Sequence, residues 1–68
     1  MKYTVIIEKG ENNYGAYIPD LPGCVAVGET KKEVLRLIKE AIKLHLESMQ
    51  NDGIEIPEPK TISELVEV

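Results

Sequence analysis

The side chains that could do chemistry in this chain are few and stand apart from one another. A catalytic histidine needs a nucleophile or an orienting carboxylate within reach, and the sole histidine, His45, falls among apolar residues of a predicted helix. A reactive thiol needs a nearby cation or helix N-terminus, and the sole cysteine, Cys24, begins a predicted strand. We interpret His45 as a buried or interfacial histidine and Cys24 as a small buried hydrophobe.

The sequence offers no ligand set for a metal or a cofactor. One cysteine and one histidine cannot form a zinc site, and a lone cysteine cannot form an intramolecular disulfide. The five glycines stand at turns or at the ends of predicted elements and do not form a phosphate-binding loop. The sequence also has no Ser, His and Asp in an order typical of a catalytic triad. We therefore predict that the protein is not an enzyme and uses no cofactor.

Charge argues for a protein partner rather than a nucleic acid. Twelve acidic and eight basic residues give a net charge of −4, which suits a basic partner. A basic stripe about 60° wide on the predicted helix is largely neutralised by an acidic stripe beside it, which is typical of a solvated helix face. The stripes consist of Lys32, Arg36, Lys39 and Lys43, and of Glu33, Glu40 and Glu47.

Length and hydropathy predict one small domain, residues 1–68, in the cytoplasm. No apolar stretch approaches the roughly 20 residues that span a bilayer, and residues 1–4 do not open a signal peptide. A chain of 68 residues is near the lower limit for a single core without a disulfide or a metal. We therefore expect a homo-oligomer, with dimer and tetramer both open.

The elements that position these residues are three strands and one helix. Residues 3–8, 14–18 and 24–28 are rich in β-branched, aromatic and small apolar residues, and their short connections predict an antiparallel meander. Residues 3–8 are apolar on both faces, which predicts a central strand. Thr30 and Glu33 form a capping box that begins a helix, and Gly53 supplies its C-terminal residue.

The helix has an apolar sector wider than one sheet requires, so part of it is expected to meet another chain. Its centre is formed by Val34, Ile38, Ala41, His45 and Met49. Pro57 and Pro59 make residues 54–59 an extended connector. Residues 65–68 are predicted to form a last strand, although residues 63–65 could instead begin a helical turn.

The most particular segment is the loop Tyr17-Ile18-Pro19-Asp20-Leu21-Pro22-Gly23-Cys24. Each proline fixes its own φ and holds the preceding residue extended. Asp20 is expected to accept from nearby backbone N–H groups, and Gly23 to take a positive φ. Alone, such a loop needs no function beyond reversing the chain.

Together with Gly28-Glu29-Thr30, residues 41–47 and residues 53–59, this loop resembles the HicB-like antitoxin family, of the short UPF0150 type without a C-terminal DNA-binding domain. The resemblance covers nearly the whole chain. It implies an α+β fold of order β-β-β-α-β, with the meander, a last strand beside and parallel to the first, and the helix on one sheet face. This is a partial RNase H-like fold.

The resemblance also implies an antitoxin that neutralises a small, basic, RNA-cleaving HicA-type toxin, without direct DNA binding. We predict partner contacts at Tyr17, Asp20 and Leu21, and self-association through Leu65, Val66 and Val68. The alternatives are an RNase H-like nuclease or RNA-binding protein, and an orphan module that binds another protein. A nuclease is disfavoured because residues 4–7, the middle of the first strand, include no carboxylate to hold a metal ion.

Overall fold

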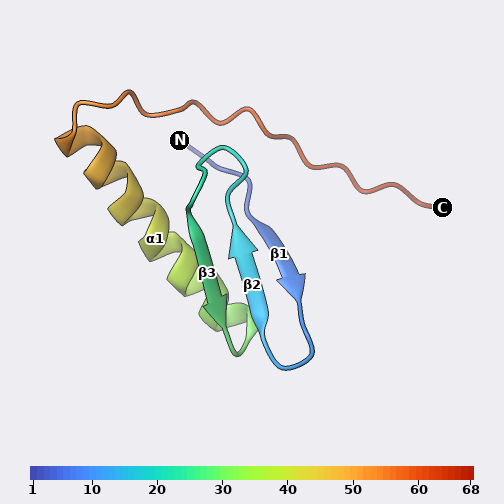
Figure 1. Cartoon of the computed structure of the whole chain (residues 1–68). Helices are drawn as coiled ribbons and strands as arrows, with labels where there is room; N and C mark the ends of the chain where they lie inside the picture. Colours follow the sequence, from blue (N-terminus) through green and yellow to red (C-terminus); the bar gives the residue numbers. More distant parts are fainter.

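The computed structural model describes all 68 residues as a three-stranded sheet with one helix (Figure 1). Strands β1 (Ile6–Lys9), β2 (Tyr14–Tyr17) and β3 (Val25–Gly28) form an antiparallel meander in the order β1-β2-β3. The helix α1 (Lys31–Asn51) follows, and residues 54–68 are extended. The predicted α+β class, meander and single helix are confirmed.

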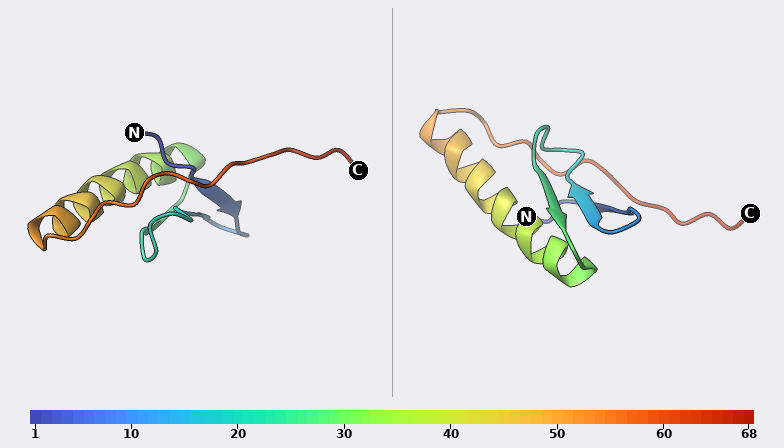
Figure 2. Two further views of the ribbon diagram at one scale, coloured as in Figure 1. Left: turned by 90° about the horizontal axis from the view of Figure 1, so that it is seen from above. Right: turned by 60° about the horizontal axis from the view of Figure 1, so that its bottom comes forward.

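Strand register gives the sheet two different faces. Ile7, Ala16 and Ala26 form one cross-strand row on the face toward α1. The neighbouring rows, Ile6–Tyr17–Val25 and Glu8–Gly15–Val27, alternate with it and point to the opposite side. The views in Figure 2 show no helix on that opposite side, which we call the open face.

α1 begins and ends as its sequence predicts. Thr30 is the N-cap and accepts from the Glu33 N–H at 3.0 Å. The second bond of a capping box would join the Glu33 carboxylate to the Thr30 N–H, but this carboxylate accepts from the Glu29 N–H at 3.0 Å instead. Gly53 has φ +69°, and the Ile54 N–H bonds the Met49 carbonyl at 2.8 Å, which closes a Schellman motif. No helix here is both long and apolar enough to cross a bilayer.

The core is small and lies between α1 and the half of the sheet formed by β2 and β3. Six apolar side chains are buried, two from the helix and four from β2 and the loop that follows it. They are Ala16, Ile18, Leu21, Cys24, Val34 and Ile38. The predicted apolar centre of the helix is confirmed, because Ala41, His45 and Met49 are half-buried along the same face.

Gly28 lets the helix approach the end of β3 closely. A Cβ at this position would lie 2.8 Å from the Val34 backbone nitrogen and 3.1 Å from the Val34 Cα, and neither atom can move without shifting the helix. Gly15, on the open face, would meet nothing within 4 Å. Of the two strand glycines, only Gly28 stands where the packing of the helix leaves no room for a side chain.

The expected last strand is not formed. The sheet has three strands, residues 65–68 are extended without a partner strand, and β1 is an edge strand rather than a central one. Apolar residues on both faces of β1 predicted a central strand that is buried on both sides. In the structure Ile6 and Ile7, on opposite faces of β1, are each only half-buried, so the prediction of a central strand is wrong. A strand of this length is stable only with a neighbour, and in this structure none lies beside residues 62–68.

Substituting Gly28→Ala is expected to destabilise the fold by about 1–3 kcal/mol, because the added methyl group collides with the helix backbone. The matched Gly15→Ala variant should be neutral or more stable by up to about 1 kcal/mol, because alanine loses less backbone entropy in a strand. Urea unfolding followed by circular dichroism measures both. Equal stability of the two variants would contradict the close approach.

Candidate functional site

The loop between β2 and β3 is rigid because its backbone groups bond one another. The Leu21 N–H bonds the Ile18 carbonyl and the Cys24 N–H bonds the Leu21 carbonyl, each at 3.0 Å, while the Ile18 N–H bonds the Cys24 carbonyl at 3.2 Å. Gly23 has φ +85°, as predicted for the return into β3. Leu21 is wholly buried, so the loop is also part of the core.

The Asp20 carboxylate joins this loop to Lys60 and Thr61, which directly follow the predicted connector of residues 54–59. Below, the connector denotes residues 54–61. Oδ2 accepts from the backbone N–H groups of Lys60 and Thr61 at 3.1 Å each, and Oδ1 accepts from the Thr61 hydroxyl at 2.9 Å. We call these three hydrogen bonds the Asp20 clamp. They join residues about 40 positions apart in the sequence.

The expectation that Asp20 accepts from nearby backbone N–H groups is therefore wrong. Within the loop, the N–H groups of Leu21 and Cys24 already bond loop carbonyls, so they have no need of the carboxylate. The side chain instead points outward to two consecutive N–H groups of the connector. Those groups belong to an extended segment without a partner strand, so the carboxylate supplies the acceptor that a sheet would otherwise provide.

The clamp lowers the pKa of Asp20 below its usual value. The N–H and hydroxyl of Thr61, followed by the Lys60 N–H and charge, favour the ionised carboxylate and outweigh the opposing effect of desolvation. Because the folded-state pKa is the lower one, the clamp is complete above the ordinary carboxyl pKa. It is lost as the pH falls through the lowered value.

Tyr3 and Thr4, which precede β1, also bind the connector, through its carbonyl groups. The Tyr3 hydroxyl donates to the Pro57 carbonyl, and the Thr4 hydroxyl donates to the Thr61 carbonyl at 2.9 Å. Desolvation, with a smaller contribution from the charge of Asp20, raises the pKa of Tyr3 and keeps its hydroxyl protonated as a donor. Thr61 is thus fixed by both Asp20 and Thr4, which sets the direction in which the chain leaves the body.

The open face carries an apolar surface that α1 does not cover. Val25 and Val27 are each 63% exposed, and Tyr17 beside them is 40% exposed. They line a shallow depression of about 310 Å³ over the middle of the sheet, with Glu8 at one side and Gly15 leaving its floor open. Sequence reasoning identified Tyr17 here but missed both valines, although their alternation with Cys24 and Ala26 is the usual signal of an outward-facing row.

The predicted partner-binding residues do not form one surface. Tyr17 lies on the open face, Asp20 is occupied by the connector, and Leu21 is inside the core. Of the three, Tyr17 is exposed on the open face, whereas Asp20 holds the connector and Leu21 packs inside the loop, so a direct contact of Tyr17 with a partner also stays a prediction. Their role in binding stays a prediction, as does self-association through the exposed Leu65, Val66 and Val68.

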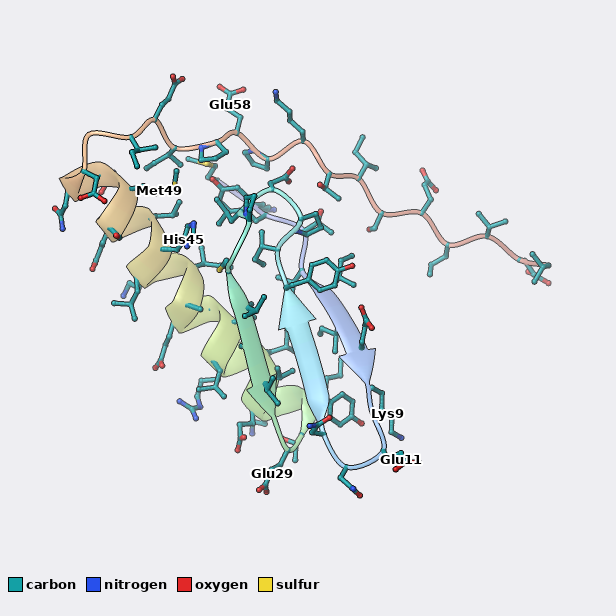
Figure 3. All side chains as sticks on the ribbon, viewed as in Figure 1. Lys9, Glu11, Glu29, His45, Met49 and Glu58 are labelled. Atoms are coloured by element: carbon teal, nitrogen blue, oxygen red, sulfur yellow. The ribbon has the colours of Figure 1, made fainter.

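The other chemistry-bearing residues serve packing or face solvent. Cys24 is buried and burial raises the pKa of its thiol, as expected of a small core hydrophobe. His45 is half-buried and points from α1 toward the side of the loop and connector (Figure 3). On the charged stripes, Arg36 and Glu40 form an exposed pair at 3.7 Å. No three His, Cys, Asp or Glu side chains gather as a metal would require.

Comparison with known proteins identifies the family. The family model of the HicB-like antitoxins of bacterial toxin–antitoxin systems matches residues 3–68. The chain belongs to the HicB-like antitoxin family. A UPF0150 protein of Thermoplasma acidophilum is 52% identical over 58 residues, which cover 84% of this chain and 84% of that protein.

Two other relatives are longer than this HicB-like chain. Antitoxin HicB 2 of Photorhabdus laumondii is 33% identical over 94% of this chain and 46% of its own length. A 14.9 kDa protein of Haemophilus phage HP1 is 38% identical over 97% of this chain and 50% of its own. This chain spans about half the length of these two relatives. Among solved structures, a chain of the HicA3–HicB3 toxin–antitoxin complex matches with a TM-score of 0.73 at 32% identity, over 87% of this chain and 70% of that chain.

Substituting Asp20→Asn is expected to release the connector, because an amide replaces one acceptor oxygen with a donor and removes the charge. Amide hydrogen exchange at Lys60 and Thr61 should accelerate by roughly an order of magnitude, while exchange in α1 is unchanged. Asp52→Asn is the matched control, because Asp52 caps the helix through its backbone N–H. Equal protection of Thr61 in both variants would contradict the clamp.

The same hydrogen bonds predict an acid-dependent release. As the pH falls through the lowered pKa of Asp20, the amide signals of Lys60 and Thr61 in NMR spectra should shift together toward exposed values. The Asp20→Asn variant should show no such step. A step that survives in this variant would assign the titration to another group.

Proposed function

We propose that this HicB-like chain is an antitoxin that neutralises a small HicA-type RNA-cleaving toxin by binding it. The observation that carries the proposal is the likeness to a chain of the HicA3–HicB3 complex, at 32% identity over 87% of this chain. The relative named Antitoxin HicB 2 supports it in sequence. The role is that of a binding protein, and the cytoplasm, where cellular RNA is cleaved, is its proposed location.

Charge supports this partner. A toxin that binds RNA presents a basic surface, and an acidic module gains association rate and specificity against it. The net charge here is −4. Glu11 and Glu29 lie at one end of the sheet in Figure 3, and Glu8 lines the depression of the open face. Acidic groups therefore border the apolar surface.

We place the toxin contact on the open face, centred on Tyr17, Val25 and Val27. Tyrosine supplies a large amphipathic contact at low entropic cost, and interface cores combine such residues with apolar neighbours. The loop with its internal hydrogen bonds begins directly after Tyr17. Glu8 and Glu11 provide a charged rim for the basic side chains of the toxin.

A nuclease derived from an RNase H-like fold is the alternative. It lacks support in β1, because the one carboxylate of this strand, that of Glu8, lies on the open face and no two further His, Cys, Asp or Glu side chains gather with it to hold a metal ion. The helix glutamates Glu40 and Glu47 are exposed on its outer side. The purified chain should therefore leave RNA intact with Mg²⁺ or Mn²⁺, and metal-dependent cleavage that tracks this chain through purification would favour the alternative.

Co-expression with the small basic HicA-like protein of a neighbouring reading frame should restore growth and yield a co-purifying complex. Val27→Glu should weaken the complex at least roughly tenfold, because it places a carboxylate in the apolar contact, and Tyr17→Ala should act in the same direction. Leu44→Glu is the matched control, because Leu44 is equally exposed but lies on α1. Isothermal titration calorimetry measures the affinities.

Two outcomes contradict different parts of the proposal. If the wild-type chain neither restores growth nor binds the toxin at micromolar concentrations, it is not the antitoxin of that toxin. If Val27→Glu and Tyr17→Ala bind as the wild type does and Leu44→Glu does not, the toxin contacts the helix rather than the open face. Circular dichroism of each variant confirms that the fold is retained.

A further inference from the structure

β3 forms a free edge of the sheet, and the backbone groups on its outer side belong to Val25 and Val27. The Ile18 N–H bonds the Cys24 carbonyl at 3.2 Å, so these two residues form a hydrogen-bonded pair where β2 and β3 meet the loop. Such pairs alternate with non-bonded ones along an antiparallel ladder, so Ala26 also bonds β2. Val25 and Val27, which alternate with it, therefore point their N–H and C=O groups away from the sheet.

β3 lacks the features that usually protect such an edge. Edge strands are commonly protected by charged side chains, by proline or by a bulge, because their unpaired backbone groups attract other extended chains. β3 has the sequence Val-Ala-Val-Gly and pairs with β2 in continuous register, without a charge, a proline or a bulge. β1, at the other edge, includes the charged Glu8 and Lys9. The unprotected edge of β3 is therefore suited to binding a strand.

The outer edge of β3 is continuous with the apolar surface of the open face. Val25 and Val27 direct their side chains to that face, where each is 63% exposed beside Tyr17. In an added strand, alternate side chains would lie next to these valines, because successive side chains of a strand point to opposite faces. One extended segment can therefore bond the backbone of the edge and cover the valines at the same time.

The charges near β3 favour a basic segment. Residues 17–30 include Asp20 and Glu29 and no lysine or arginine. Glu29 directly follows β3 and is exposed at the end of the sheet (Figure 3). The Glu33 carboxylate lies next to it, because this carboxylate accepts from the Glu29 N–H at 3.0 Å. A strand with a lysine or arginine beside Glu29 would therefore be complementary in charge.

We propose that the toxin adds an extended segment to the outer edge of β3, as a fourth strand of the sheet. The segment is at least as long as β3, with alternate apolar residues facing Val25 and Val27 and a basic residue near Glu29. This inference rests on the proposed function and specifies how the toxin is recognised. Main-chain hydrogen bonds supply affinity, and the exposed valines select apolar residues at alternate positions of the segment.

Amide hydrogen exchange followed by NMR distinguishes strand addition from a contact between side chains alone. In the free chain, the Val25 and Val27 amides should exchange rapidly, whereas the Ala26 amide is protected by β2. In the complex with the HicA-like protein of a neighbouring reading frame, exchange at Val25 and Val27 should slow at least roughly tenfold. A contact between side chains alone leaves these two N–H groups without acceptors, so their exchange stays fast.

Val27→Pro removes one outward N–H group, at a position where an edge strand tolerates proline because this N–H does not bond the sheet. The variant should raise the dissociation constant of the complex at least roughly tenfold in isothermal titration calorimetry. Val27→Ala is the matched control, because it removes more of the apolar side chain but keeps the N–H group. It should weaken binding less than Val27→Pro does. Circular dichroism checks that both variants fold.

The outcomes separate this inference from the proposed function. A toxin that does not bind the wild-type chain overturns both. A toxin that binds while exchange at Val25 and Val27 stays fast leaves the antitoxin role intact and overturns strand addition. A Val27→Pro variant that binds as well as Val27→Ala overturns it too. If Val27→Pro does not fold, the exchange measurement decides by itself.

Discussion

The packing of α1 against β2, β3 and the loop between them is the interaction on which the rest of the molecule depends. Val34 and Ile38 meet Ala16, Ile18 and Leu21, and Gly28 allows the approach. This core consists of only six buried side chains. It does not extend under β1 or over the open face, so those surfaces remain available for partners. The small core is thus the physical reason that apolar side chains stay exposed on the open face.

The connector is attached to this core by polar contacts instead of apolar ones. Asp20, Tyr3 and Thr4 supply side chains to backbone groups that an additional strand would normally satisfy. Asp20 is placed correctly because Leu21, its neighbour, is buried and the prolines fix the loop around both. The proline loop therefore has two functions within the fold: it closes the core, and it fixes the direction of the C-terminal segment.

Local patterns predicted most of this fold. The N-cap at Thr30, the positive φ at Gly53 and the three strands depend on residues close in sequence, and all are confirmed, although the Glu33 carboxylate accepts from Glu29 and not from Thr30. The partner of Asp20 could not be predicted, because its acceptors are satisfied by residues about 40 positions away. The apolar pattern of residues 65–68 indicates a strand but not its neighbour, and the isolated chain provides none. On the open face, Tyr17 was among the predicted contact residues. Val25 and Val27 were not, and the only signal for them in the sequence is their alternation with Cys24 and Ala26.

Residue-resolved amide hydrogen exchange of the full chain tests the account most directly. The account predicts the strongest protection in β2, β3 and the first turns of α1, because these amides belong to the core. It predicts intermediate protection at Lys60 and Thr61, whose amides are held only by the Asp20 carboxylate. Protection at Lys60 and Thr61 as strong as that of the core, or no protection there at all, would contradict it.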